Sequence, residues 1–220
     1  MARQLDDVAP MFPLGSVLVP HMLLPLQVFE ARYRVLMEEL VGQLPRPDDQ
    51  RGWGDDPRFG VTMIERGHEV GGADVRAEVG TLATVVGAQL AEDGRWAVVA
   101  VGGERVRVIE WLEDDPYPRA RLKLWPDEDE RLSADVRRGL RTRHAEMLAL
   151  LGELGVEATD QGPDWTDPPE RLLWQVALAS PLGSFDRYQL LDAPGTSERA
   201  RRLSTQLDDQ LALLRARLDP

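Results

Sequence analysis

The hydrophobic pattern of the chain changes near Pro126, and this change limits the folds that the sequence can adopt. Before it, short apolar runs alternate with turn residues, and residues 105–111 alternate polar and apolar side chains with the period of a half-buried strand. After it, apolar residues recur at spacings of three and four, which is typical of helices that face a core. The pattern predicts an α+β chain, with a β-rich lobe at residues 1–126 and an α-helical bundle lobe at residues 127–220.

The β-rich lobe is expected to hold several short strands and one helix. Strands are predicted at 14–19, 59–65, 80–86, 96–101, 105–111 and 119–125. Asp93-Gly94 predicts a hairpin turn, because a tight turn needs a residue that tolerates a positive φ. Gly102-Gly103 predicts a second turn. Phe29, Tyr33, Leu36 and Leu40 form a helical stripe, and residues 42–58, which include Trp53, form a long polar loop.

Four helices are expected in the second lobe. One covers 133–154, and a second begins at Asp167 as the N-cap, with Pro168 at the first helical position. Ser184 is predicted to cap a short third helix and Thr196 to cap the last one, which carries a leucine stripe. This arrangement predicts a bundle.

Composition excludes several classes of site. The chain has no cysteine, which rules out disulfides, thiolate metal sites and cysteine nucleophiles. Residues 1–126 carry 14 basic and 20 acidic side chains and the remainder carries 12 and 18, so each lobe has a net charge of −6. Neither lobe therefore offers the basic surface that nucleic-acid binding requires. The single lysine, Lys123, is not in a phosphate-binding loop. With 25 arginines against one lysine, the composition suggests a bacterial genome rich in G+C.

Catalytic, metal-binding and membrane-spanning patterns were not found. His21, His68 and His144 are far apart in sequence, and no serine lies in a nucleophile elbow. The N-terminus is polar, and three prolines interrupt the apolar run at 11–28, so a spanning helix is not expected there. The sequence predicts a cytoplasmic protein that is not an enzyme, with no metal, no cofactor and no membrane contact.

The proline-punctuated segment 20–29 is the candidate binding surface. Prolines at both ends of Met22–Leu24 oppose regular strand pairing, so apolar side chains there are expected to be available for an extended peptide. The candidate peptide-binding residues are His21, Met22, Leu23, Leu24, Phe29 and Trp53. In the alternative, Met22, Leu23 and Leu24 plug the end of the barrel in the β-rich lobe. Glu30 and Arg34, four residues apart on the predicted helix, are expected to form a structural ion pair.

Ordered blocks of sequence resemble one known family. Met11-Phe-Pro-Leu-Gly-Ser, Leu24-Pro-Leu-Gln-Val-Phe-Glu-Ala-Arg-Tyr, Phe59-Gly-Val, Val79-Gly-Thr-Leu-Ala and Gly103-Glu-Arg-Val-Arg-Val resemble the substrate-binding N-terminal domain of Lon proteases. His21 stands where that family often has glycine. The resemblance implies a PUA-like pseudo-barrel followed by helices, in a free-standing member that lacks the ATPase and protease domains.

The resemblance also implies a function. The expected role is a non-enzymatic module that recognises unfolded or degron-bearing polypeptides, as an adaptor or quality-control factor. A separate protease or chaperone and weak self-association are further candidate interactions. The alternative is a small-molecule-binding protein or enzyme that uses the cleft between the lobes, with His21, Glu30 and Arg32. RNA binding by analogy with PUA-like domains is a third hypothesis, which the negative charge opposes.

Overall fold

A computed structural model describes residues 8–42, 57–66, 75–128, 131–156 and 162–218. Its internal contacts divide the chain into two compact units, Met1–Pro126 (unit 1) and Asp127–Pro220 (unit 2). Unit 1 contains six strands and one helix, and unit 2 contains four helices, within the described ranges. The predicted α+β class is confirmed.

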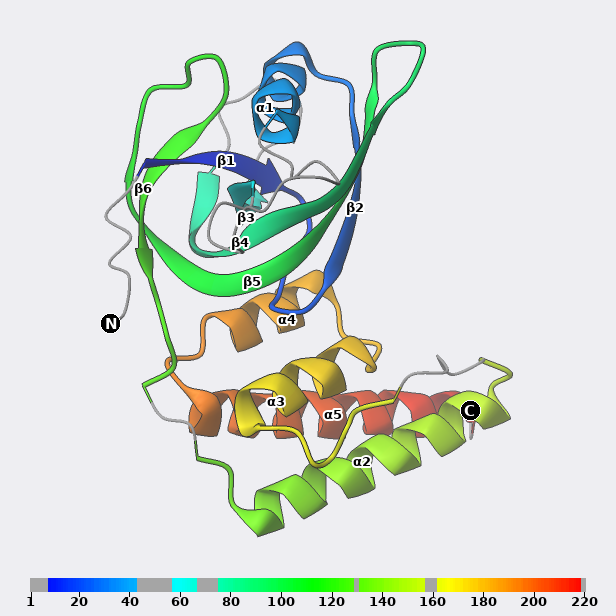
Figure 1. Cartoon of the computed structure of the whole chain (residues 1–220). Helices are drawn as coiled ribbons and strands as arrows, with labels where there is room; N and C mark the ends of the chain where they lie inside the picture. The colour runs from blue at the N-terminus through cyan, green and yellow to red at the C-terminus, as the bar shows by residue number, and fades with distance from the viewer. Residues whose placement is uncertain (1–7, 43–56, 67–74, 129–130, 157–161, 219–220) are drawn as a thin grey trace. The chain divides into compact units, whose positions relative to one another are not determined.

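Unit 1 is built on one sheet that closes on itself (Figure 1). Along the sheet the order is β2-β5-β4-β3-β1-β6, and β5 also pairs with β6, which closes five strands into a ring. β1 and β3 are parallel, and the other paired strands are antiparallel. The strands are β1 (Val8–Leu14), β2 (Leu23–Val28), β3 (Arg58–Arg66), β4 (Val75–Leu90), β5 (Trp96–Trp111) and β6 (Arg119–Leu124).

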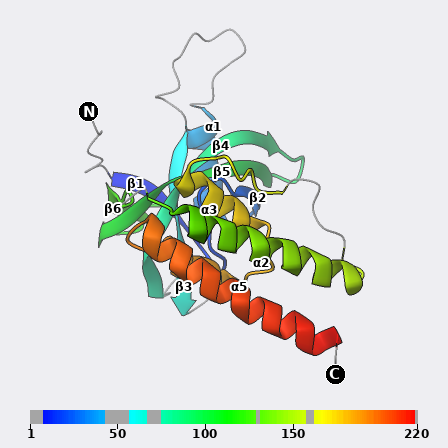
Figure 2. The same ribbon diagram turned by 90° about the horizontal axis from the view of Figure 1, so that it is seen from below.

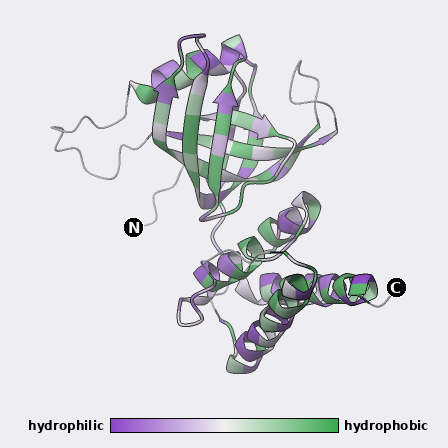
Figure 3. Cartoon of the chain, turned by 90° about the vertical axis from the view of Figure 1, so that its right-hand side faces the viewer, coloured by the Kyte–Doolittle hydropathy of each residue, from purple (hydrophilic) through white to green (hydrophobic). Residues whose placement is uncertain are grey.

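The strands of unit 1 enclose the main apolar core. Figure 3 shows hydrophobic and hydrophilic bands alternating along the strands, as expected where one face of a sheet is buried. Helix α1 (Ala31–Val41) buries Tyr33, Leu36, Met37 and Leu40 against this core. The predicted turn at Asp93-Gly94 is confirmed: Gly94 has a φ of +79°, and β4 and β5 pair from Leu90 and Trp96 onward.

Two predictions for unit 1 are wrong. The first strand is Val8–Leu14, not 14–19, because residues 8–10 pair with β6 and residues 11–14 pair with β3. Gly102-Gly103 makes no turn and lies inside β5. A side chain at Gly102 would collide with the backbone carbonyl of Val19, so glycine is required there for the close approach of segment 15–22.

Unit 2 is organised around its longest helix, α5 (Thr196–Leu218). α5 packs against α2 (Ala134–Glu153), α3 (Pro169–Leu178) and α4 (Ser184–Leu191), and its leucine stripe is buried. Figure 2 shows α2 and α5 side by side. Arg143 pairs with Asp208 and Glu146 pairs with Arg215, so α2 and α5 run in the same direction.

Three helix starts in unit 2 differ from prediction by one residue, and Thr196 is the first residue of α5 instead of its cap. Pro168, not Asp167, precedes α3, and Asp167 instead accepts a hydrogen bond from Gln175 and pairs with Arg171. Gly183 is the N-cap of α4, where Ser184 was predicted, because the Asp186 carboxylate accepts the Gly183 N–H. Within the described ranges, no helix is long and apolar enough to cross a bilayer.

Candidate functional site

Strand β2 lies at the end of the sheet order, so one of its edges has no strand neighbour among the described residues. Gly102 N–H donates to Met22 O at 2.9 Å, and hydrogen-bonded positions in an antiparallel ladder alternate. Leu24, Leu26 and Val28 therefore direct their backbone groups toward β5, and Leu23, Pro25 and Gln27 direct theirs away. Pro25 removes an N–H from the free edge and none from the ladder. This explains why β2 pairs regularly although the prolines of segment 20–29 predicted the opposite.

Strand β1 presents a similar edge. Met11 N–H donates to Pro118 O at 2.8 Å, on the side away from β3. Pro13 lies two residues further along β1, so the N–H that proline lacks would have pointed to that same side. Residues 12–14 of β1 and 25–28 of β2 line a common pocket. Pro13 and Pro25 thus occupy positions where another residue would offer an N–H for strand pairing. No pairing between β1 and β2 is seen in the described residues, and a gap lies between these two edges.

The pocket in this gap, which we call the seam pocket, has a volume of about 210 Å³. It is lined by residues 12–14 and 25–30 and by Tyr33. Phe12 and Tyr33 stack with their ring centroids 4.0 Å apart, and Phe29 at the rim is 58% exposed. This volume is below the roughly 300–1,000 Å³ of ordinary small-molecule sites, so the pocket suits a side chain better than a cofactor.

A second, shallower hollow lies over β2, β4 and β5, and we call it the outer groove. It has a volume of about 500 Å³ and is lined by residues 25–27, 87–89 and 97–99. None of these nine residues is charged, in a chain of which 29% of residues are charged. Leu23 on the same strand is 62% exposed, and Val99 also faces solvent. The seam pocket and the outer groove share Pro25, Leu26 and Gln27 of β2, and we call both of them, together with Leu23, the β2 surface.

The structure places the candidate binding residues in different environments. Leu23 and Phe29 are exposed on the β2 surface, whereas Leu24 is only 7% exposed and Met22 packs against the core. Substitutions at Met22 or Leu24 would therefore perturb folding. His21 is exposed at the turn before β2. Trp53 lies outside the described residues.

The expected ion pair between Glu30 and Arg34 is replaced by another. Arg32 Nε lies 3.1 Å from Glu30 Oε2, and Arg34 donates only its backbone N–H to Glu30 O, at 2.9 Å. Glu30 is the N-cap residue of α1 with an extended ψ of 136°, so the four-residue helical spacing does not apply to its side chain. Arg32 also approaches Asp114, at 3.8 Å.

A second titratable pair near α1 is hydrogen-bonded. Tyr117 Oη donates to Glu39 Oε2 at 2.6 Å, and burial together with this hydrogen bond raises the pKa of Tyr117 to about 12. The phenol therefore stays protonated at neutral pH and does not act as a base. In the ranges that the structure covers, no group of three or more His, Asp or Glu side chains is arranged to hold a metal ion.

His21 adopts a backbone conformation that favours glycine, with a φ of 66°. Its N–H donates to Gly102 O at 2.8 Å, which fixes the turn that leads into β2. Because a side chain in the left-handed region costs roughly 1–2 kcal/mol and glycine adds unfolded-state entropy, we expect His21→Gly to raise the free energy of unfolding by about 0.5–1 kcal/mol. Urea denaturation measures this change.

His21→Ala is the control for this prediction. It removes the same imidazole but keeps a Cβ at the positive φ, so we expect no gain in stability. Equal stabilisation by alanine and glycine would show that the imidazole, and not the backbone, is unfavourable at this position.

Comparisons with known proteins give one consistent result. Residues 8–209 match the family model of the ATP-dependent protease La (LON) substrate-binding domain. Lon protease of Chloroflexus aggregans is 29% identical over 222 residues, and Lon protease 2 of Herpetosiphon aurantiacus is 26% identical over 210 residues. These alignments cover 95% and 93% of this chain but 25% and 24% of the relatives. The chain therefore spans about a quarter of the length of the curated relatives it matches.

Solved structures show the same fold. A Lon N-terminal domain protein from Xanthomonas campestris superposes with a TM-score of 0.61 at 24% identity, over 92% of this chain and 98% of the other. The N-terminal domain of a Mycobacterium avium complex Lon protease gives a TM-score of 0.59 at 16% identity, over 92% and 99%.

Proposed function

Because the chain belongs to the family of Lon protease substrate-binding domains, we propose that it binds unfolded or degron-bearing polypeptide segments along the β2 surface. The observation that carries this proposal is the uncharged outer groove beside the seam pocket. A groove without charged residues suits segments that expose apolar side chains after unfolding. A role as an adaptor that presents such segments to a separate protease or chaperone is part of the same proposal.

The mode of binding follows from the backbone of the two edges. Pro25 removes one donor between those of Leu23 and Gln27 on the free edge of β2, and Pro13 removes one from β1, so an added strand would pair irregularly and gain fewer main-chain hydrogen bonds. Its affinity would come instead from side chains, one in the seam pocket and others across the outer groove. Such contacts are sequence-tolerant, because apolar burial is non-directional and proportional to area. Weak binding to many unfolded segments is the expected behaviour.

A titration with one protein in two states tests the proposal. We expect a fluorescently labelled, carboxymethylated unfolded polypeptide to bind saturably, and its native folded form not to bind. Leu23→Asp and Val99→Asp should each raise the dissociation constant by about tenfold or more, because burying a large aliphatic side chain contributes roughly 1.5–3 kcal/mol. Fluorescence anisotropy gives the dissociation constants.

Ile109→Asp is the matched control. Ile109 is also an exposed apolar residue of β5, but it lies outside the β2 surface, at the irregularity between Val108 and Glu110 in the half of the strand that pairs with β6. Its substitution should leave binding unchanged. Equal loss in all three variants, or equal affinity for the folded and unfolded polypeptide, would contradict the proposed site.

A further inference from the structure

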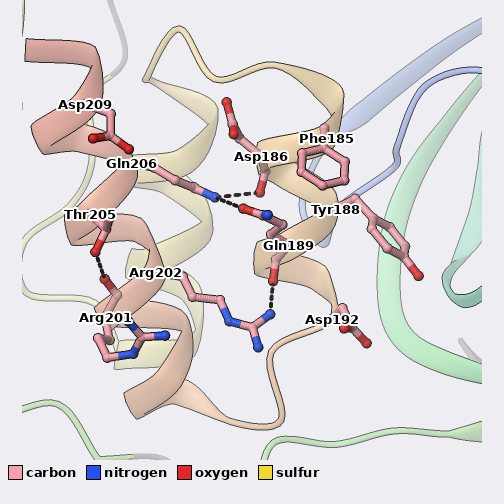
Figure 4. A pocket seen from close by; sticks show the side chains of 10 residues that line it. All are labelled: Phe185, Asp186, Tyr188, Gln189, Asp192, Arg201, Arg202, Thr205, Gln206 and Asp209. Atoms are coloured by element: carbon pink, nitrogen blue, oxygen red, sulfur yellow. Dashed lines mark hydrogen bonds between the residues drawn. The ribbon is translucent and has the colours of Figure 1, made fainter.

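A separate hollow lies inside unit 2, between α4 and α5 (Figure 4). Its volume is about 550 Å³, and every residue that lines it belongs to these two helices or to Asp192 directly after α4. It is independent of the β2 surface, which belongs to unit 1. Its lining includes three aspartates and two arginines. The hydrogen bonds that these side chains already make decide which of the charges a ligand can pair with.

Both arginines are held by hydrogen bonds to Glu198. Arg201 donates from Nε and Nη2 to the two oxygens of Glu198, at 2.7 Å each. Arg202 donates from Nε to Glu198 at 2.7 Å and from Nη1 to the backbone oxygen of Gln189 at 2.6 Å. These bonds lower the pKa of Glu198 to about 2, so the carboxylate stays charged and holds both guanidinium groups. Glu198 therefore offsets part of the positive charge that the two arginines bring to the hollow.

The acceptors in the hollow are in excess. The carboxylate of Asp209 has no hydrogen-bond or ion-pair partner within the described ranges, and that of Asp186 accepts only the Gly183 N–H, at 3.3 Å. Gln206, three residues before Asp209 on α5, is 7% exposed. Its Nε2 donates to Asp186 O at 3.0 Å and to Gln189 Oε1 at 3.2 Å (Figure 4).

These bonds fix the orientation of the Gln206 amide, because the backbone oxygen of Asp186 accepts and cannot donate. The Oε1 atom of Gln206 is consequently buried with no donor among the described residues. An unpaired buried acceptor is costly, so this wall of the hollow is short of hydrogen-bond donors. Asp186 and Asp209 both neighbour Gln206, so a ligand that brings donors to the hollow would also meet negative charge.

An aromatic side chain completes the hollow. Phe185 of α4 is 65% exposed, and its ring stands at the rim near Asp186 (Figure 4). Aromatic faces attract cations, and a planar guanidinium stacks on them while its five donors reach acceptors in its plane. From the excess acceptors, the carboxylates and this ring, we propose that the hollow between α4 and α5 binds an arginine side chain of a partner polypeptide.

Three peptides test this assignment on the full chain. We expect Gly-Gly-Arg-Gly-Gly to shift the side-chain amide resonances of Gln206 in NMR titrations. The matched peptide with citrulline has the same shape without the charge, and it should bind about tenfold more weakly or not at all. The peptide with lysine should also bind more weakly, because an ammonium group lacks the planar fork.

Two variants separate the hollow from general charge effects. Asp209→Asn should weaken binding of the arginine peptide several-fold, and Asp208→Asn should not. Asp208 lies one residue away but pairs with Arg143 on the side of α2. Phe185→Leu replaces an exposed ring without disturbing the core, and it should weaken binding even if Asp209→Asn fails to fold. Equal binding of the arginine and citrulline peptides, equal loss in both aspartate variants, or no shift at Gln206 would overturn the assignment.

Discussion

Replacing Asp127 with alanine is expected to lower the free energy of unfolding of unit 2 by about 3–5 kcal/mol, because it leaves a buried arginine unpaired. The Arg199 side chain is 1% exposed. It donates from Nη1 and Nη2 to the two carboxylate oxygens of Asp127, at 2.6 Å each, and its guanidinium lies 4.3 Å from the centre of the Trp174 ring. Thr196 also donates to Asp127, at 3.0 Å. Urea denaturation followed by helical circular dichroism measures the loss.

Two further variants show whether the cost comes from the unpaired charge. Asp127→Leu combined with Arg199→Met removes both charges and should be less destabilising than Asp127→Ala alone. Arg143→Met breaks the bidentate pair with Asp208, which is exposed, and should cost about 1 kcal/mol or less. If Asp127→Ala cost no more than Arg143→Met, the buried pair would not stabilise unit 2 as the geometry indicates.

Local patterns predicted the elements of this fold better than their pairing. The Asp93-Gly94 hairpin and the helical stripes of α1 and α5 depend on neighbours within a few residues, so the sequence contains the signal. The path of residues 8–28 depends on β3, β5 and β6, which lie far along the chain. The sequence suggested a strand at 14–19 because that segment is apolar. Residues 8–14 form the strand instead, because β3 and β6 pair with them.

The candidate site was predicted in part for the same reason. Segment 20–29 was singled out because it combines apolar side chains with prolines, and Leu23 and Phe29 are indeed exposed there. The prolines were expected to prevent a strand, whereas Pro25 only depletes its free edge. The outer groove was missed, because Val99 belongs to a run that is apolar on both faces. That run suggests a buried strand until the register with β2 and β4 is known. The ion pair between Glu30 and Arg34 was predicted from helical spacing, but Glu30 lies before the first residue of α1.

Gly102→Ala is expected to destabilise unit 1 by about 3 kcal/mol or more. A Cβ at this position would overlap the carbonyl oxygen of Val19 and press on the side chain of Leu18. Neither neighbour can move easily. Leu18 O accepts a hydrogen bond from Thr81 Oγ1 at 2.7 Å, and Gly102 itself is hydrogen-bonded to His21 and Met22. A clash with fixed backbone belongs to the overpacking and strain mechanisms that give the largest effects of single substitutions. The midpoint and slope of urea denaturation give the loss.

Gly87→Ala is the control, because a Cβ there meets no atom within 4 Å. Without a positive φ at Gly87, alanine should be neutral or stabilise by up to about 1 kcal/mol. The contrast has a functional consequence under the proposed function. Gly102 holds the turn that precedes β2, so its substitution should abolish polypeptide binding together with the fold of the strand. Gly87 lines the outer groove, and an added methyl group there should preserve or slightly strengthen binding. Loss of binding in a stable Gly87→Ala variant would indicate that the bound segment approaches the β4 backbone closely, which places the polypeptide across the groove and not along β2.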